Sequence, residues 1–259
     1  MSDEAALLAR FDVARVRAEN PGPFTLTGTN TWVLGRDPCW VVDPGPLIED
    51  HLGAILEEAG RRGGIGGIAV THEHADHVEA VEALRARADG AALARGARDG
   101  DELGPLRAIA TPGHAPEHVA WAYGRVCCTG DAVLGQGSVF VAPSPGALSS
   151  YLDALRRLRA MGFELLAPGH GPPVADPAAK LDEYVSHRLD RERRLLDALA
   201  QGRRTTDELL DEVWSDAPAN LRPAAAVTLA AHLDKLAEEG RLPDGVQGPE
   251  IDPRLSGAG

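Results

Sequence analysis

The stretch 68-IAVTHEHADH-77 decides both the fold class and the chemistry expected of this chain. An apolar run ends at Val70, and four potential metal ligands follow within six residues. His72 and His74 lie two residues apart, so at an extended strand end they project to the same side and can bind one metal ion. Asp76 and His77 come next and can turn toward a second ion. The pattern predicts a two-metal loop behind a buried strand.

Three interpretations of this cluster differ in function. Solvated histidines in a polar turn would bind nothing, and a structural zinc site would be closed by four protein ligands. Side chains divided between two neighbouring ions, with a carboxylate among them, leave room for water and suit catalysis. The density of ligands directly behind a strand favours the catalytic interpretation.

Further candidate ligands occur downstream in three motifs, each behind an apolar run. The motifs are TPGH at Thr111–His114, TGD at Thr129–Asp131 and PGHGP at Pro168–Pro172. Strands that end in glycine-containing turns would bring these side chains to one edge of a sheet, where functional loops usually gather. Either histidine alone is more simply a loop residue. Together with the first cluster, His114, Asp131 and His170 complete two ligand sets.

These motifs and their order resemble the metallo-beta-lactamase superfamily, with Asp43 of WVVDPGP as the first motif. The resemblance implies an α/β fold, an αββα sandwich. It implies that Asp131 bridges two ions and that Asp43 lies behind the ligands. The remaining ligands would divide into His72, His74 and His114 on metal one and Asp76, His77 and His170 on metal two. The commonest zinc beta-lactamases place cysteine where Asp131 stands, so the glyoxalase II and nuclease branches are the better match.

A closer resemblance is to the beta-lactamase-like protein 2 group, over about residues 15–242. It is carried by NPGPFTLTGTNTWVLG at Asn20–Gly35, TPGHAPEHVA at Thr111–Ala120, GDAVLGQG at Gly130–Gly137 and YVSHRLDRERRLL at Tyr184–Leu196. That group includes a mitochondrial endoribonuclease acting on single-stranded RNA and fungal thioesterases acting on polyketide synthase products. The resemblance therefore implies a hydrolase and leaves the substrate open.

The expected cofactors are two divalent metal ions. Histidine-rich ligands favour Zn²⁺, with Mn²⁺ or Fe²⁺ as alternatives. A hydroxide bridging the two ions is the expected nucleophile. Asp76 is the candidate for orienting it or carrying its proton. His118, four residues after His114, is a second catalytic candidate that could reach a substrate oxygen, and its alternative is a hydrogen bond to backbone.

Three functions follow, in order of preference. The first is hydrolysis of single-stranded RNA by an endonuclease, as the closest resemblance implies. The formal net charge of −13 opposes binding of a polyanion. The second is hydrolysis of a small-molecule thioester, either hydroxyacylglutathione hydrolase-like or polyketide-releasing, to which an acidic protein raises no objection. The third, a non-enzymatic nucleic-acid-binding regulator, is disfavoured because the ligand set is intact.

The composition suits a globular protein, with 259 residues and 44% apolar content. We expect a catalytic domain over residues 1–177 and a C-terminal helical, winged-helix-like domain over residues 178–259. The N-terminus lacks a long apolar run, so a cytoplasmic protein without membrane contact is expected. Cys39, Cys127 and Cys128 are expected to be reduced core residues.

Strands are predicted at 31–34, 40–42, 68–70, 106–110, 118–123, 125–129 and 165–167. Helices are predicted at 48–59, 78–88 and 149–161, where apolar residues recur every three or four positions. Residues 178–239 predict three helices, with an N-cap at Thr205 or Thr206 and a short wing over 240–245.

The C-terminal segment contains the dense basic cluster Arg188, Arg191, Arg193 and Arg194. A helix-helix-helix-wing order suggests a nucleic-acid module. However, residues 178–259 contain eleven basic against sixteen acidic residues, whereas nucleic-acid modules usually present a basic face. A solvated helix face paired with Asp190 and Glu192 explains the cluster equally well. We therefore interpret the segment mainly as a cap over the active site and as a candidate homodimer surface.

Overall fold

The structure, a computed structural model, describes residues 3–251 of the 259-residue chain. These residues form two compact units. The sheet unit comprises residues 3–111, 117–138 and 161–178, and the helical unit comprises residues 112–116, 139–160 and 179–251. The division of the chain at residue 177 and the role of the C-terminal segment as a cap stay predictions.

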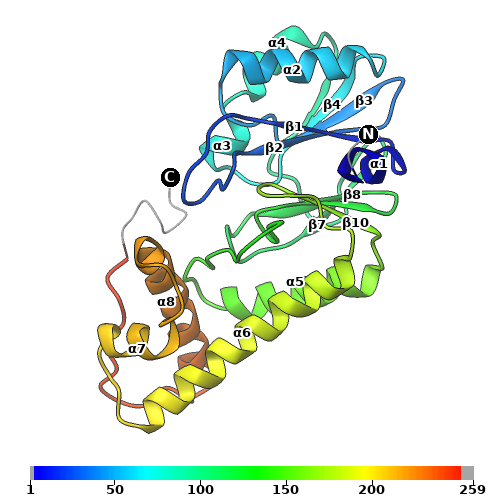
Figure 1. Ribbon diagram of the computed structural model, residues 1–259. Helices are drawn as coiled ribbons and strands as arrows, with labels where there is room; N and C mark the ends of the chain where they lie inside the picture. Colours follow the sequence, from blue (N-terminus) through cyan, green and yellow to red (C-terminus); the bar gives the residue numbers. More distant parts are fainter. Residues whose placement is uncertain (1–2, 252–259) are drawn as a thin grey trace. The chain divides into compact units, whose positions relative to one another are not determined.

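Two five-stranded sheets pack face to face in the sheet unit (Figure 1). The first sheet has the order β1 (Val13–Arg17), β2 (Asn30–Leu34), β3 (Cys39–Val42), β4 (Ile65–Ala69) and β5 (Ala92–Ala94). The second has the order β10 (Leu165–Pro168), β9 (Val126–Gly130), β8 (Val119–Tyr123), β7 (Leu106–Ala110) and β6 (Glu102–Leu103). In the first sheet β4 pairs in parallel with both β3 and β5, and in the second sheet β9 pairs in parallel with β10.

The alternation of side chains along β2 explains how the first sheet is covered. Trp32 and Leu34 face the second sheet and pack with Trp121 and Cys128 in the core between the sheets. Val33 points to the other face, because successive side chains of a strand alternate. That face is covered by α2 (Glu49–Gly60) and α4 (Val81–Arg87), which contribute a set of apolar side chains: Leu52, Ile55, Ala59 and Leu84. Burial on both faces explains why residues 32–34 of β2 are apolar without alternation.

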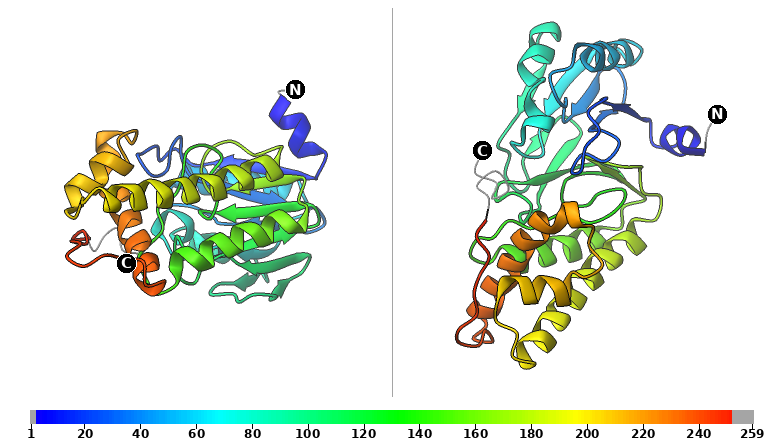
Figure 2. Two further views of the ribbon diagram at one scale, coloured as in Figure 1. Left: turned by 90° about the horizontal axis from the view of Figure 1, so that it is seen from below. Right: turned by 60° about the vertical axis from the view of Figure 1, so that its left-hand side comes forward.

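The helical unit contains α5 (Ala147–Met161), α6 (Pro177–Ala200), α7 (Thr206–Val213), the short 3₁₀ helix η1 (Ala219–Leu221) and α8 (Arg222–Glu238). Helices α5 and α6 lie side by side (Figure 2), and Arg159 of α5 binds Asp182 of α6. A separate core joins the end of α6 to α7 and α8; its members include Leu195, Leu199, Leu209, Trp214, Leu229 and Leu236.

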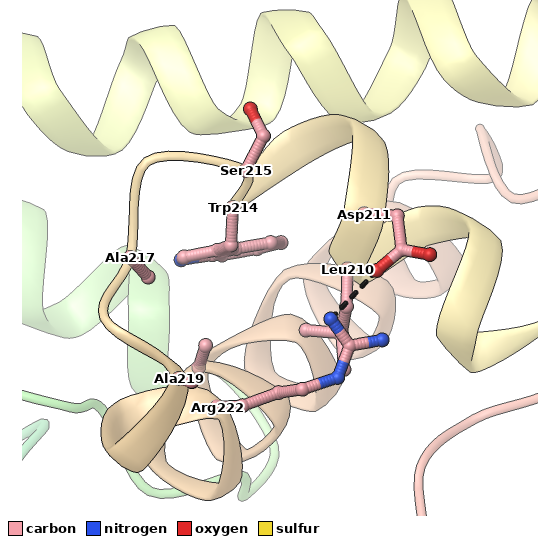
Figure 3. A pocket seen from close by; sticks show the side chains of 8 residues that line it. Leu210, Asp211, Trp214, Ser215, Ala217, Ala219 and Arg222 are labelled. Carbon is pink, nitrogen blue, oxygen red and sulfur yellow. Dashed lines mark hydrogen bonds and ion pairs between the residues drawn. The ribbon is translucent and has the colours of Figure 1, made fainter.

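Helix α7 begins where the sequence predicts. Thr205 is the N-cap, its hydroxyl accepts a hydrogen bond from the backbone N–H of Glu208, and the Glu208 carboxylate binds the backbone N–H of Thr205. This reciprocal capping box satisfies two backbone donors that the first helical turn leaves open. Beyond the end of α7, Trp214 faces a pocket of the helical unit whose edge is formed by Arg222 bound to Asp211 (Figure 3).

The α/β fold class and the C-terminal helices are confirmed, with several differences in detail. The predicted helix over 78–88 is divided into α3 (Ala75–Val78) and α4. The short elements α1 (Asp3–Ala9), β1, β5 and β6 were not predicted. Residues 240–245, the predicted wing, form turns and contain no strand. The three cysteines are free and buried, as expected.

Candidate metal centre

The candidate ligands of the sheet unit lie directly beyond strand ends. His72 and His74 occupy the loop after β4, and Asp76 and His77 lie in the following helix α3. Asp131 comes directly after β9, and His170 lies two residues beyond β10. Parallel neighbours such as β9 and β10 present their carboxyl ends at one edge, where ligand-binding loops of α/β sheets gather.

Two glycines allow these loops to approach closely. A Cβ atom on Gly169 would lie 2.5 Å from Asp131 Oδ1 and 2.7 Å from His77 Cε1. A Cβ on Gly130, which has a φ of +47°, would lie 2.5 Å from the Thr71 hydroxyl. Real Cβ contacts essentially never occur at such distances, so the TGD and PGHG motifs require glycine at both positions for packing, and Gly130 also for its conformation.

The loops bring the predicted side chains into two overlapping groups. Potential ligand atoms of His72, His77 and Asp131 lie within 4.8 Å of one another, and so do those of Asp76, His77 and His170. The distance from His170 Nε2 is 3.2 Å to Asp76 Oδ2 and 3.4 Å to Asp131 Oδ2. His77 Nε2 lies 3.6 Å from Asp131 Oδ1. Donor atoms around a tetrahedral zinc ion with bonds of about 2.1 Å are about 3.4 Å apart, so the spacing fits.

The surroundings of His77 also fit a metal ligand. The residue is fully buried, and its Nε2 atom has no hydrogen-bond partner within the described residues. Leaving a buried polar atom unsatisfied costs about 1–3 kcal/mol. Nε2 instead faces the carboxylates of Asp76 and Asp131 at 3.5 and 3.6 Å. A divalent ion among these atoms would satisfy all three groups, so the residues present fit the cofactor that the motifs imply.

Asp43 lies behind the ligands and fixes their orientation. Its Oδ1 accepts a hydrogen bond from the Thr71 backbone N–H, and its Oδ2 accepts one from the Thr71 hydroxyl, each at 2.8 Å. His77 Nδ1 lies 2.9 Å from Oδ2 and His72 Nδ1 lies 3.0 Å from the Thr71 hydroxyl. Because the Thr71 proton goes to Asp43, His72 must donate from Nδ1. In the neutral form both imidazoles therefore carry their proton on Nδ1, and Nε2 is the atom that can bind a metal ion.

The electrostatics of the group favour bound cations. Burial alone would lower the pKa of His77, but the carboxylates of Asp131, Asp43 and Asp76 raise it to about 9. Burial would also lower the pKa of His170, but the carboxylates of Asp131 and Asp76 raise it to about 10. Burial would raise the pKa of Asp76, whereas the neighbouring imidazoles lower it to about 2. Concentrated carboxylates thus stabilise positive charge at this edge of the sheets.

His118 is buried, and both ring nitrogens are hydrogen-bonded. Nε2 accepts from the backbone N–H of Asp131 at 3.1 Å, so Nδ1 carries the proton and donates to the Thr111 hydroxyl at 2.8 Å. This geometry corresponds to the alternative considered from the sequence, a histidine bonded to backbone. It favours a role in holding Asp131, and contact between His118 and substrate stays a prediction.

His114 belongs to the helical unit, through residues 112–116. It is 3% exposed, and its Nδ1 lies 3.4 Å from the Phe140 carbonyl oxygen. If Nδ1 donates to this carbonyl, the lone pair of the neutral ring is on Nε2, as in a histidine that binds a metal. Its membership of the first ligand set stays a prediction.

Several residues that shape the site were not identified from the sequence. Thr71 links Asp43 to His72, Thr111 holds His118, and Thr29 donates a hydrogen bond to Asp76 at 3.2 Å. Each threonine is adjacent to, or inside, a motif that the sequence did single out. The position of each threonine beside a ligand motif could have suggested that its hydroxyl supports a ligand. The partner of the hydroxyl could not be predicted, because it lies far away in sequence or is reached only in one side-chain rotamer.

Comparison with known proteins agrees with this geometry. The model of the metallo-beta-lactamase superfamily matches residues 93–170, and that of the beta-lactamase associated winged helix domain matches residues 205–243. A metallo-beta-lactamase family protein from Thermus thermophilus superimposes with a TM-score of 0.67 and 26% identity, over 88% of this chain and 94% of that one. The chain belongs to the metallo-beta-lactamase superfamily, whose members are hydrolases, and it carries the associated winged helix domain.

Within the superfamily, two kinds of relative are similar over nearly the full length. The beta-lactamase-like protein 2 homolog of Caenorhabditis elegans is 31% identical, over 88% of this chain and 85% of the relative. An atrochrysone carboxyl ACP thioesterase of Aspergillus chevalieri is also 31% identical, over 91% and 84%. The resemblance inferred from the motifs is therefore confirmed. No helix within residues 3–251 is both long and apolar enough to cross a bilayer.

Proposed function

We propose that this protein is a dinuclear metal-dependent thioester hydrolase. His72, His74 and His114 would hold the first ion, Asp76, His77 and His170 would hold the second, and Asp131 would contact both. Two divalent ions, when bound, lower the pKa of water and stabilise the negative charge that develops during attack on a carbonyl. The donor spacing around His77, Asp131 and His170 supports this assignment.

The protein's own residues prepare the site for that chemistry. Asp43 and Thr71 keep the imidazole lone pairs of His72 and His77 directed inward. His118 holds the backbone of Asp131, whose two oxygens face different imidazoles, His77 and His170. Asp76, with its low pKa, remains an acceptor for a proton on attacking water. Histidine-rich ligands with few carboxylates favour zinc over manganese or iron.

The observation that favours a thioester over RNA as substrate is the state of the arginine cluster. Arg188 is 2% exposed and donates to the Val139 carbonyl, and Arg191 is 5% exposed and binds both oxygens of Asp216. Arg193 and Arg194 pair with Asp190. RNA binding draws its affinity from cationic side chains on phosphates. A cluster that is buried or paired with carboxylates supplies little of that affinity, so the first preference from the sequence gives way to thioester hydrolysis.

The leaving group supports the same choice. A thiol has a pKa of about 8.5, so it can depart as a thiolate without receiving a proton. A ribose oxygen is a far stronger base and departs more readily when an acid donates a proton to it. His118, the catalytic candidate that could reach a substrate oxygen, already uses both ring nitrogens in hydrogen bonds to Thr111 and Asp131. A fungal thioesterase among the relatives of similar length agrees with this proposal.

The proposal is tested with zinc-loaded and manganese-loaded protein. Each form is incubated with a panel of acyl thioesters, with the matching oxygen esters and with a labelled single-stranded RNA. We expect thioester turnover, slower turnover of oxygen esters and no RNA cleavage, and we expect all activity to disappear in Asp131→Asn. RNA cleavage that disappears in the same variant, without thioester turnover, would return the assignment to the endoribonuclease.

A further inference from the structure

The segment between β1 and β2, residues 18–29, contains the motif NPGPFTLTGT, which the proposed function leaves without a role. It is a folded loop that runs beside α3 (Figure 1). The backbone N–H of Ala18 donates to the Thr29 carbonyl at 2.8 Å, and the Gly22 N–H donates to the Leu26 carbonyl at 3.2 Å. Its two ends are therefore held together, and the position of Thr29 is fixed.

Asn20 and Thr29 form a reciprocal pair across the base of this loop. The backbone N–H of Thr29 donates to Asn20 Oδ1 at 2.9 Å, while Asn20 Nδ2 donates to the Thr29 hydroxyl at 3.0 Å. The side-chain amide of Asn20 is thus fixed in orientation by a backbone donor. The amide donor then occupies one lone pair of the Thr29 hydroxyl, which leaves the hydroxyl proton for another acceptor.

That acceptor is Asp76. The Thr29 hydroxyl donates to Asp76 Oδ2 at 3.2 Å, and Thr29 is fully buried. The same oxygen lies 3.2 Å from His170 Nε2 and 3.5 Å from His77 Nε2. Oδ2 is therefore the atom that faces the second ligand set. A carboxylate oxygen has two lone pairs, so one can accept from Thr29 while the other faces the imidazoles.

The same loop also supports His170. The Gly28 carbonyl oxygen lies 3.4 Å from His170 Nδ1, and Thr29 pairs with His170 in an isolated β-bridge. Gly28 has a φ of +128°, and a Cβ there would lie 2.0 Å from the Ala18 carbonyl oxygen. Only glycine can occupy this corner, and it turns its carbonyl toward the imidazole. Two of the three residues proposed for the second ion are thus oriented by adjacent residues of one loop.

We propose that Thr29, held by Asn20, is a positioning residue that selects the rotamer of Asp76 for the second metal ion. The inference rests on the proposed dinuclear site and adds a specific control of one of its two ions. Partners that orient metal ligands typically contribute 10–100-fold to metal affinity. The effect should concern the second ion alone, because the hydrogen bonds of Thr29 lead to Asp76 and not to His72 or His74.

The test compares Thr29→Val, which keeps the shape and removes the donor, with Thr29→Ser, which keeps the donor. Zinc is titrated against a competing chelator, so that the two dissociation constants are measured without an activity assay. We expect Thr29→Val to weaken one of the two ions about 10–100-fold and to leave the other within about threefold. Thr29→Ser should bind like the wild type. Asn20→Ala should weaken the same ion by a smaller factor, because Thr29 keeps its hydroxyl but loses its orientation.

Two controls separate positioning from general damage. Thr228→Val removes another buried threonine hydroxyl, one that bonds the Ala224 carbonyl in α8, and should leave both constants unchanged. The unfolding temperature of each variant in a chelator reports whether the metal-free protein is folded. Equal weakening of both ions by Thr29→Val, or wild-type binding of both, would overturn the inference. A wild-type protein that binds fewer than two ions would instead overturn the proposed function.

Discussion

At the residue scale, Asp131 is the side chain on which both ligand groups depend. Its two oxygens lie 3.6 Å from His77 Nε2 and 3.4 Å from His170 Nε2. Asp131→Asn replaces one of these oxygens with a donor that cannot bind a metal ion. We expect hydrolysis of the best substrate to fall by more than about 100-fold, since even outer partners of metal ligands contribute 10–100-fold. Steady-state rates check this, with the exposed Asp153→Asn as the matched control.

Asp43 gives a second prediction at this scale, through the protonation of His77. The Thr71 backbone N–H requires an oxygen at the Oδ1 position. In Asp43→Asn the new amide must therefore face His77 Nδ1, which would then accept a hydrogen bond and leave the proton on Nε2. We expect zinc affinity to fall about 10–100-fold. Chelator competition measures it, and unchanged affinity with a folded protein would show that Asp43 does not set the tautomer.

The sequence predicts the residues that bind metal far better than the residues that orient them. His72, His74, Asp76 and His77 are close in space because they are close in sequence, so their spacing was sufficient. Thr29 reaches Asp76 across 47 positions, and the contact depends on a loop conformation that Asn20 stabilises. The local spacing of residues predicts neither which distant residues come into contact nor the direction in which a hydroxyl donates its proton. Such partners can be identified only in the folded structure.

At the scale of elements, helix α7 depends on a cap that the sequence does encode. Thr205 and Glu208 satisfy each other's backbone donors, and the helix has only eight residues. We expect Thr205→Ala to reduce the free energy of unfolding by about 1 kcal/mol, the usual cost of losing a threonine N-cap. Chemical denaturation measures it. Thr206→Ala is the neighbouring control, because its hydroxyl bonds the Gln247 carbonyl and lies outside the cap; an equal loss would contradict the capping argument.

Elements with a strong apolar pattern were predictable, and elements stabilised by tertiary contacts were not. Strands β2 and β9 are buried throughout, three of the five residues of β7 are buried, and α5 has a clear apolar face. Strand β1 reads VARVR, with only Val13 buried, and it becomes a strand because β2 offers an edge to pair with. Strand β6 has two residues and depends on β7. From the sequence, the arginine run on α6 could equally have bound phosphate. Only the structure shows that these side chains bind carboxylates and carbonyl oxygens of the protein itself.

At the scale of the whole molecule, the net charge of −13 leads to a prediction about salt. A protein that binds single-stranded RNA through 6–10 phosphate contacts loses roughly 10²–10⁴ in affinity between 50 and 200 mM salt. A thioester substrate with few charges should show kcat/KM changes of less than about threefold over that range, because screening acts on charge pairs. Rates at both ionic strengths measure the difference. A steep decline with salt would favour a polyanionic substrate.

The pH dependence of stability should be governed in part by a histidine far in sequence from the metal ligands. His232 of α8 is fully buried, and neither ring nitrogen has a hydrogen-bond partner within the described residues. It lies near the Trp214 ring and near the cationic side chains of Arg188, Arg191 and Lys235. Burial, and then these charges, lower its pKa to about 3. His187 contributes in the same direction, with its pKa lowered to about 4 by burial and by Arg188 and Arg191.

A lowered pKa in the folded state means that the unfolded chain binds more protons below pH 6.5. The stability from neutral His232 is therefore complete above that pH and is lost as pH falls from 6.5 toward 3. At pH 5 the loss is about 1–2 kcal/mol, since each pKa unit corresponds to about 1.4 kcal/mol. His232→Leu removes the ionisable group, so its unfolding free energy should fall less between pH 8 and pH 5 than that of the wild type. Chemical denaturation of the metal-free proteins at the two pH values measures this difference, and an equal decline in both would show that His232 does not titrate with unfolding.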